Sequence, residues 1–300
     1  MKRKISGFTI VELLLVLGII ALLVGVLIPS LTTVRNSARE AKQKAQFTAI
    51  EVALTAFKND YGDYPPSDGW YYIPAPGGPL DYCGAQKLAE ALLGWDLLGF
   101  HPKSAWRSDG YDGMASNGPL TYDPDKVRDI NGDGIPETFD ERKGPYLELA
   151  AASAFKLGDL FRPFPTGPLA PDTFVLCDVF SAKKVTMFKG TDPVTGQPIT
   201  VTERAGAPIL YYRANTSGKT INGIYRVIDN DAIVMTKQQA DGKEHPLARS
   251  AGQYQFFYDY IRNPKIAVRP WPYRHDSYIL ISAGADGLYG TGDDIRNFGN

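Results

Sequence analysis

The chain has 300 residues, of which 44% are hydrophobic and 22% are charged, an ordinary globular composition that excludes a disordered chain, a collagen and a long coiled coil. Its 32 lysines and arginines nearly balance its 33 aspartates and glutamates, so no broad basic surface for nucleic acid is expected. Two cysteines exclude a disulfide-dense scaffold and a cysteine-rich zinc or iron–sulfur site.

The N-terminal segment combines a basic start with a long apolar run. Lys2, Arg3 and Lys4 are followed by residues 13–28, which are all apolar or glycine. The 21 residues 8–28 would form a helix about 31 Å long, enough to cross the hydrocarbon core of a bilayer. The cations predict a cytoplasmic N-terminus with the bulk of the chain outside the cytoplasm. A cleavable secretory signal and a plain single-pass anchor are alternative interpretations.

Glu12 is the charged exception within this apolar segment. A carboxylate in such a helix costs about 2–3 kcal/mol unless it is paired, so Glu12 is a candidate functional residue that needs a partner.

The residues around Glu12 form a motif, Gly7-Phe8-Thr9-Ile10-Val11-Glu12-Leu13, that resembles the class III signal of type IV pilins and pseudopilins. The resemblance implies that a prepilin peptidase cleaves between Gly7 and Phe8 and methylates the new amino group. Glu12 of one chain can then pair with the Phe8 ammonium of its neighbour in a helical stack. Breaking a buried pair of this kind costs on the order of 3–5 kcal/mol, so Glu12 is interpreted as an assembly residue.

Residues 30–61 contain no helix breaker, so we expect one helix over residues 8–61. A bulky stripe at helical spacing should bury against the head of the protein: Phe47, Ile50, Leu54, Phe57 and Tyr61. A second, mostly small stripe permits close approach of another helix: Leu31, Val34, Ala38, Ala41, Ala45 and Val52.

Gly62 and the Pro65-Pro66 pair end this helix, and residues 62–300 are expected to form a globular head. A short helix is predicted over residues 86–98. Six β-like runs separated by turn signals predict an antiparallel sheet packed on the long helix, and therefore an α+β fold with long loops. These runs are residues 173–179, 209–212, 224–227, 232–235, 255–261 and 278–282.

Four motifs of the head resemble the major pseudopilin of type II secretion, in the same order along the chain. They are residues 60–65, 143–147, 206–212 and 282–295. Long insertions, at about 66–142 and 150–205, separate them.

The last of these motifs is similar to the C-terminal calcium loop of that family. Asp286, Asp293 and Asp294 lie within nine residues and are interleaved with glycines, a composition that suits a metal loop or an acidic turn equally. The resemblance favours calcium, with Asp286 and Asp294 as the best candidate ligands. The carbonyls of Ser282 and Tyr289 are weaker candidates.

Residues 129–140 also fit a twelve-residue calcium loop. Oxygen-bearing side chains occupy positions 1, 3, 5, 9 and 12, and the residue at position 7 would offer its carbonyl. In order these six residues are Asp129, Asn131, Asp133, Glu137, Asp140 and, at position 7, Ile135. Asp140 stands where a bidentate glutamate is usual and no helix clearly precedes the loop, so an ordinary acidic turn is the alternative.

Signatures of catalysis are weak, and no enzyme activity is expected. Ser181 and Lys184 match S-x-x-K without its companion motifs. The histidines are scattered and show no ligand spacing. Cys83 and Cys177 could form a disulfide that stabilises the chain by up to about 4–5 kcal/mol, or they could remain two buried thiols.

Together these observations predict a structural subunit of a type II secretion pseudopilus, a single-pass inner-membrane protein with a periplasmic head. Its expected partners are identical or related pseudopilin subunits, the prepilin peptidase and the inner-membrane assembly machinery, and calcium is its expected cofactor. Two alternatives stay open: a type IV pilus subunit, including a minor one, and a membrane-tethered enzyme or binding protein that uses the same leader.

Overall fold

A computed structural model describes residues 9–68, 82–110, 121–122, 141–162, 164, 167–180, 183–193, 195–248 and 254–299, the side chains of residues 26–33, 150 and 189 excepted. The chain divides into two units, Met1–Lys42 and Gln43–Asn300. The division falls within helix α1 (Ile10–Tyr61), because the last part of that helix is buried in the second unit.

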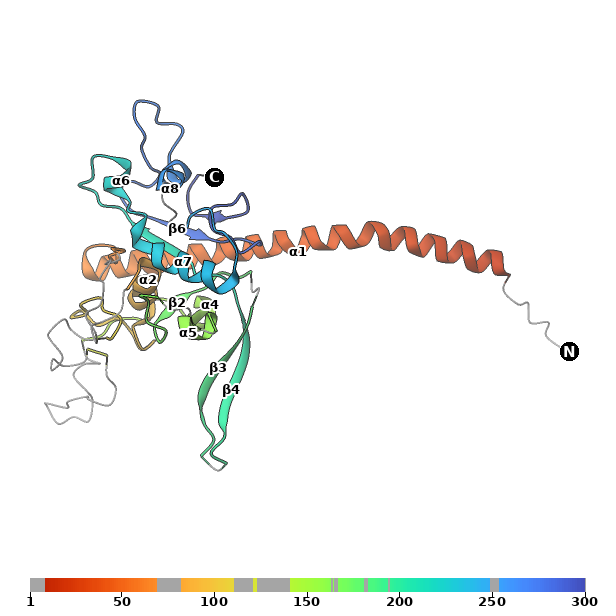
Figure 1. Cartoon of the computed structure of the whole chain (residues 1–300), viewed down its shortest axis with the longest axis horizontal. Helices are drawn as coiled ribbons and strands as arrows, with labels where there is room; N and C mark the ends of the chain where they lie inside the picture. The colour runs from red at the N-terminus through yellow and green to blue at the C-terminus, as the bar shows by residue number, and fades with distance from the viewer. Residues whose placement is uncertain are drawn as a thin grey trace. The chain divides into compact units, whose positions relative to one another are not determined.

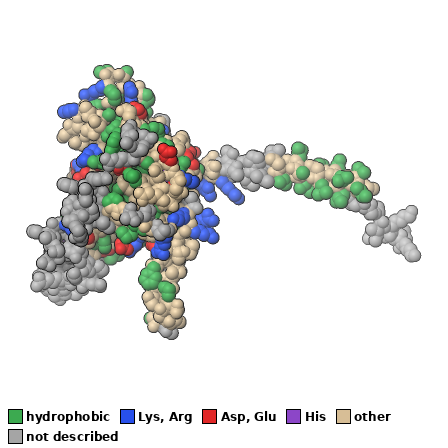
Figure 2. All heavy atoms as spheres, viewed as in Figure 1, with side chains coloured by type: hydrophobic (Ala, Val, Ile, Leu, Met, Phe, Trp, Pro, Cys, Tyr) green, Lys and Arg blue, Asp and Glu red, His purple; other side chains and the backbone are tan. Residues whose placement is uncertain are grey.

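In the first unit, α1 exposes apolar side chains on all of its faces. Twelve large apolar side chains between Ile10 and Val24 are each 43–78% exposed, and Figure 2 shows them as green spheres along the helix. Within the described part of the chain, no helix combines the length and the apolarity needed to cross a bilayer, so the span expected over residues 8–28 is not confirmed.

A three-stranded antiparallel sheet lies at the centre of the second unit. It consists of β5 (Leu210–Arg213), β6 (Tyr278–Ser282) and β7 (Ile295–Arg296), in that order; Figure 1 labels β6. Every residue of β6 is buried, and so are the first three residues of β5. These strands therefore read as continuous apolar runs, because both faces of the sheet are covered.

One face of this sheet packs against α1 and α2 (Gly84–Leu93). Four side chains of the predicted bulky stripe, Phe47, Ile50, Leu54 and Phe57, are at most 3% exposed, and Tyr61 is half-buried. The prediction that this stripe buries against the head is therefore confirmed. The short helix expected over residues 86–98 is also confirmed as α2, although α2 begins and ends earlier.

The other face packs against α7 (Ile228–Asp241) and α8 (Tyr254–Ile261), with Ile233, Val234 and Phe257 in the shared core. The strands predicted over residues 232–235 and 255–261 are therefore wrong, because both runs are helical. The run 224–227 is also wrong, since it begins at the end of α6 (Ile221–Ile224) and continues as irregular chain.

The predicted single sheet is wrong as well, because the described residues form three separate antiparallel sheets. β1 (Ala154–Lys156) pairs with β2 (Phe174–Leu176), next to the short helices α4 (Leu149–Ala152) and α5 (Leu157–Leu160). The strands predicted over residues 173–179, 209–212 and 278–282 are confirmed as β2, β5 and β6.

The third sheet is a hairpin of β3 (Lys183–Thr191) and β4 (Pro198–Ala205), within the insertion at residues 150–205. Figure 1 shows the two strands extending together away from the other head elements. Among the described side chains of the hairpin, Val185 and Ala205 at its base are buried and Met187 packs against the core, whereas Phe188, Ile199 and Val201 are 38–60% exposed. Core packing therefore fixes the base, and the pairing of β3 with β4 continues the hairpin beyond it.

Candidate functional sites

Three reciprocal hydrogen bonds between Thr9 and Glu12 cap the start of α1. The N–H and the hydroxyl of Thr9 donate to Oε2 of Glu12 at 3.0 and 2.8 Å, and the N–H of Glu12 donates to Oγ1 of Thr9 at 3.3 Å. This is a capping box, which satisfies amide groups that a helix start leaves without intrahelical partners. The spacing T-x-x-E before an apolar run is its sequence signature. The processing residues Gly7 and Phe8 lie outside the described residues.

The C-terminal loop between β6 and β7 holds the predicted calcium carboxylates, and donors of the same loop bond to them. Oδ2 of Asp293 accepts the N–H of Asp286 at 2.9 Å, and its Oδ1 accepts the hydroxyl of Thr291 at 2.6 Å. Oδ1 of Asp286 accepts the N–H of Leu288 at 2.7 Å. Burial acts to raise the pKa of Asp293, but the hydrogen bonds from Thr291 and Asp286 keep this pKa below its usual value.

Asp294 is the most enclosed of the three carboxylates. Its Oδ2 accepts the N–H of Gly290 at 2.7 Å and the hydroxyl of Tyr260, whereas its Oδ1 is buried without a hydrogen-bond partner within the described structure. Burial raises the pKa of Asp294 to about 6.

The oxygen atoms that this loop could offer as ligands suit calcium chemically, because they belong to carboxylates and backbone carbonyls. One of them, Oδ1 of Asp294, is buried without a hydrogen-bond partner in the described structure. Of the two weaker carbonyl candidates, that of Tyr289 accepts the N–H of Leu247 at 3.1 Å, and Ser282 lies opposite Ile295 in the sheet. Among the residues that the structure describes, no three His, Cys, Asp or Glu side chains are grouped as a metal site. A calcium ion would therefore combine a few carboxylates with backbone oxygens.

Two other predicted sites can be placed only in part. All six candidate ligands of the loop 129–140 lie outside the described residues. Cys83 and Cys177 are both buried thiols, and no disulfide joins these two described residues. Burial raises the pKa of the Cys177 thiol well above its usual value, so this thiol is unreactive at neutral pH.

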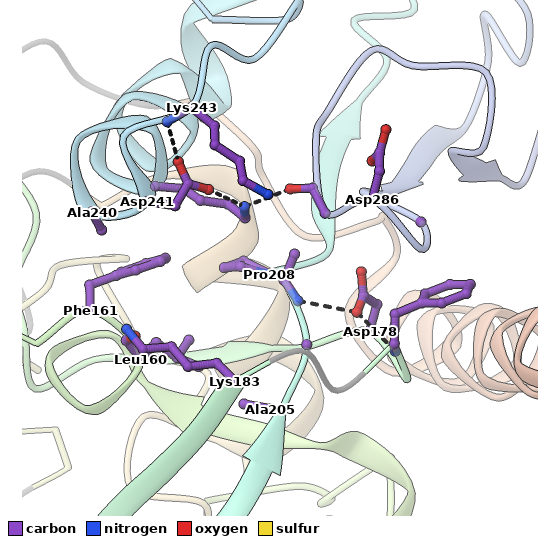
Figure 3. Close-up of a pocket in the computed structure, with 16 residues that line it drawn as sticks. Leu160, Phe161, Asp178, Lys183, Ala205, Pro208, Ala240, Asp241, Lys243 and Asp286 are labelled. Atoms are coloured by element: carbon purple, nitrogen blue, oxygen red, sulfur yellow. Dashed lines mark hydrogen bonds and ion pairs between the residues drawn. The ribbon is translucent and has the colours of Figure 1, made fainter.

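A pocket of about 190 Å³ lies beside the C-terminal loop (Figure 3). Its apolar walls come from α5, the base of the hairpin and the segment before β5. Its charged groups come from Lys183 of β3, from the last turns of α7 with Lys243 just after them, from Asp286 of the loop itself and from Asp178. Figure 3 shows Asp241 on the helix side and Asp286 on the loop side.

Asp178, at the edge of this pocket, is a residue that the sequence analysis did not single out. Its Oδ1 accepts the N–H groups of Phe180 and Ala207 at 3.2 and 3.1 Å, and its Oδ2 accepts the hydroxyl of Ser282 at 2.9 Å. Burial raises its pKa to about 6. A Cβ at Gly206 would lie 1.9 Å from Asp178 Oδ1, so only glycine fits there. The carboxyl is engaged by protein donors and fastens β6 to the segment before β5.

Comparison with curated proteins found a partial match to a secretion protein. Over 67 residues, 22% of this chain, the sequence is 33% identical to the type II secretion system core protein G of Aeromonas hydrophila, covering 47% of that protein. The chain thus spans about half the length of the curated relative that it matches. No family model and no solved structure matches the chain.

Proposed function

We propose that this chain is a structural subunit of a type II secretion pseudopilus and that it polymerises through α1. The partial similarity to a type II secretion core protein supports the choice of system. The role is one of assembly, and we propose no catalytic activity for it.

The exposed apolar surface of α1 is the observation that carries this proposal. Apolar side chains cover all faces of the helix between Ile10 and Val24. A helix of this kind is stable only when lipid or other helices cover it. We propose that lipid covers it in the free subunit and that the helices of neighbouring subunits cover it in the filament. The N-terminus then lies in the cytoplasm and the head in the periplasm.

The start of the helix supports the proposed processing. A prepilin peptidase that cleaves between Gly7 and Phe8 would leave Thr9 and Glu12 as the first capped turn of the mature chain. The free ammonium of Phe8 would then supply the partner that Glu12 needs in an apolar filament core. Related subunits and the inner-membrane assembly machinery are the other proposed partners.

Calcium would strengthen the head at the C-terminal loop. Asp286, Asp293 and Asp294 are its candidate ligands; since no three described side chains of these kinds are grouped as a metal site, the ion would use some of these carboxylates together with backbone carbonyls of the loop. The ion would supply positive charge that offsets the repulsion between carboxylates of the loop.

The proposal is tested in cells that contain a type II secretion system and no type IV pilus machinery. Mass spectrometry of the membrane-extracted chain should show a start at N-methyl-Phe8, and sheared surface filaments should contain the chain. Cells with an inactive prepilin peptidase should retain the leader and make no filament. Filaments that form only with pilus machinery would instead assign the chain to a type IV pilus. A mature chain that stays monomeric under both conditions would contradict the proposed assembly.

A further inference from the structure

The C-terminal loop is fastened to residues 237–247, which comprise the last turns of α7 and the segment after it. The N–H of Leu247 donates to the carbonyl of Tyr289 at 3.1 Å, and the N–H of Tyr289 donates to Nδ1 of His245 at 3.1 Å. The ammonium of Lys237 donates to the carbonyl of Gly287 at 2.6 Å. The loop is therefore bonded at two positions, residues 287 and 289, to one short stretch of chain.

Lys237 is held in place for this contact. Its side chain is only 12% exposed, and its ammonium donates to Oδ2 of Asp241, one helical turn later, at 2.7 Å. A hydrogen bond from an ammonium is roughly twice as strong as a neutral one. The position near the C-terminal end of α7 also favours a cation, because the helix dipole is negative there.

His245 links the contact with Tyr289 to the carboxylate of Asp241, which also bonds to Lys237. The imidazole is fully buried, and since a backbone N–H can only donate, its Nδ1 must be the acceptor for Tyr289. Its Nε2 then has the proton and donates to Oδ2 of Asp241 at 3.2 Å. Asp241 thus orients both Lys237 and His245, the two side chains that bond to the loop.

We propose that Lys237 is an internal cation that keeps the C-terminal loop closed, that is, bonded to residues 237–247, when no metal ion is bound. The loop contains three carboxylates within nine residues. The Lys237 ammonium acts on the loop through the carbonyl of Gly287, a backbone oxygen of the kind that a bound cation would otherwise engage. Calcium can add stability to the closed loop, but the closed state does not depend on it. The inference concerns the head alone and does not depend on which filament the chain builds.

Hydrogen exchange of the full chain in detergent tests this assignment, with each variant measured in calcium and in chelator. In chelator, the wild-type loop should stay protected at the amides of Tyr289 and Leu247. Lys237→Met should accelerate exchange of these amides in chelator by about tenfold or more, through local opening of the loop. Calcium should restore part of the protection in this variant.

Two control variants make the result specific to the charge of Lys237. Lys237→Arg keeps the charge and should retain protection. Lys243→Met, which alters a neighbouring lysine of the same pocket, should behave as the wild type. If Lys237→Met also exposes the amides of β6, which would indicate unfolding of the head, Lys237→Gln takes its place under the same criteria.

Three results would overturn the inference. One is an exchange rate in the Lys237 variant within twofold of the wild type in chelator. Another is a wild-type loop that is already unprotected in chelator. The third is equal acceleration by Lys243→Met, which would show a general effect of lost charge.

Discussion

Glu12 bonds to Thr9 of its own chain, and the proposed filament requires the same carboxylate to meet Phe8 of a neighbour. Glutamine separates the two roles, because its carbonyl can still accept from Thr9 in a capping box but has no charge. The assembly role of Glu12 can therefore be tested without disturbing the start of α1.

We expect Glu12→Gln to block incorporation into filaments nearly as strongly as Glu12→Ala, at least about tenfold, because each leaves one buried charge unpaired. The measurement is the fraction of variant subunits in sheared filaments when they are co-expressed with wild-type subunits. Glu40→Gln, elsewhere on α1, should incorporate normally. Normal incorporation of Glu12→Gln together with failure of Glu12→Ala would show that Glu12 acts only as a helix cap.

Asp229, in the first turn of α7, predicts a pH dependence of stability. Its Oδ2 accepts the hydroxyl of Ser67 at 2.7 Å, and burial raises its pKa from 3.8 to about 6. The folded protein therefore binds this proton more tightly than the unfolded chain does. The resulting stability is fully present below about pH 4 and is lost as the pH rises through 6. A shift of this size corresponds to on the order of 3 kcal/mol.

We expect Asp229→Asn to reduce this loss, because the amide can still accept from Ser67 and cannot ionise. Urea denaturation of wild type and variant between pH 4 and 7.5, at constant chelator, measures the effect. Asp172→Asn, at a carboxylate that is 81% exposed, is the control and should leave the wild-type profile unchanged. An Asp229→Asn profile as steep as that of the wild type would contradict this account.

At the scale of the elements, the sequence predicted secondary structure best where the spacing of apolar residues alone decided it. The bulky stripe from Phe47 to Phe57 has helical spacing with one buried face, and it lies where expected. The runs over residues 232–235 and 255–261 are rich in β-branched and aromatic residues, which favour strands. In α7 that preference is outweighed by acidic residues in the first turn and by Gly242, whose φ of 67° closes the helix end. In α8, Phe257 and Ile261 bury one helical face.

The candidate sites likewise divide into features that depend on neighbouring residues in the sequence and features that depend on the fold. The T-x-x-E spacing of Thr9 and Glu12 is local, so the sequence could have predicted the capping box. The contacts of Asp178 with Ala207 and Ser282, and of Lys237 with Gly287, join segments that only the fold brings together. No spacing along the chain identifies such pairs.

The C-terminal loop, as an element, gives a prediction about calcium. Binding to the folded state alone stabilises by about 2.7 kcal/mol at a hundredfold excess of ligand over Kd. We expect a higher melting temperature in calcium than in chelator, and expect Asp286→Ala or Asp294→Ala to remove most of the difference. Asp172→Ala is the control outside the loop. An unchanged melting temperature, with no calcium in the purified protein, would leave the loop as an acidic turn.

At the scale of the whole molecule, the head includes the last part of α1. Gln43 and Gln46 bond to Val179 and Cys177 at 2.9 and 3.0 Å, and Phe47, Ile50 and Leu54 belong to the core. Burying each of these three apolar side chains stabilises by about 1.5–3 kcal/mol. Their sum is comparable to the 5–15 kcal/mol, roughly, that stabilises a typical domain.

We therefore expect a chain that starts at Arg35 to fold and unfold cooperatively, and a chain that starts at Thr55 to remain unfolded. Circular dichroism and thermal denaturation of the two truncated chains provide the measurement. A cooperative transition in the chain that starts at Thr55 would show that the head does not need α1.

The first residue of β3 and the last residue of β4 are paired, because Lys183 lies opposite Ala205. The two ends of the hairpin are therefore adjacent, and the cost of closing a longer excursion between them grows only slowly with its length. A longer peptide could therefore replace the turn at residues 192–197 without moving the strands of the central sheet. The proposed filament would then present a grafted epitope, enzyme tag or affinity peptide once per subunit, at regular intervals along its length.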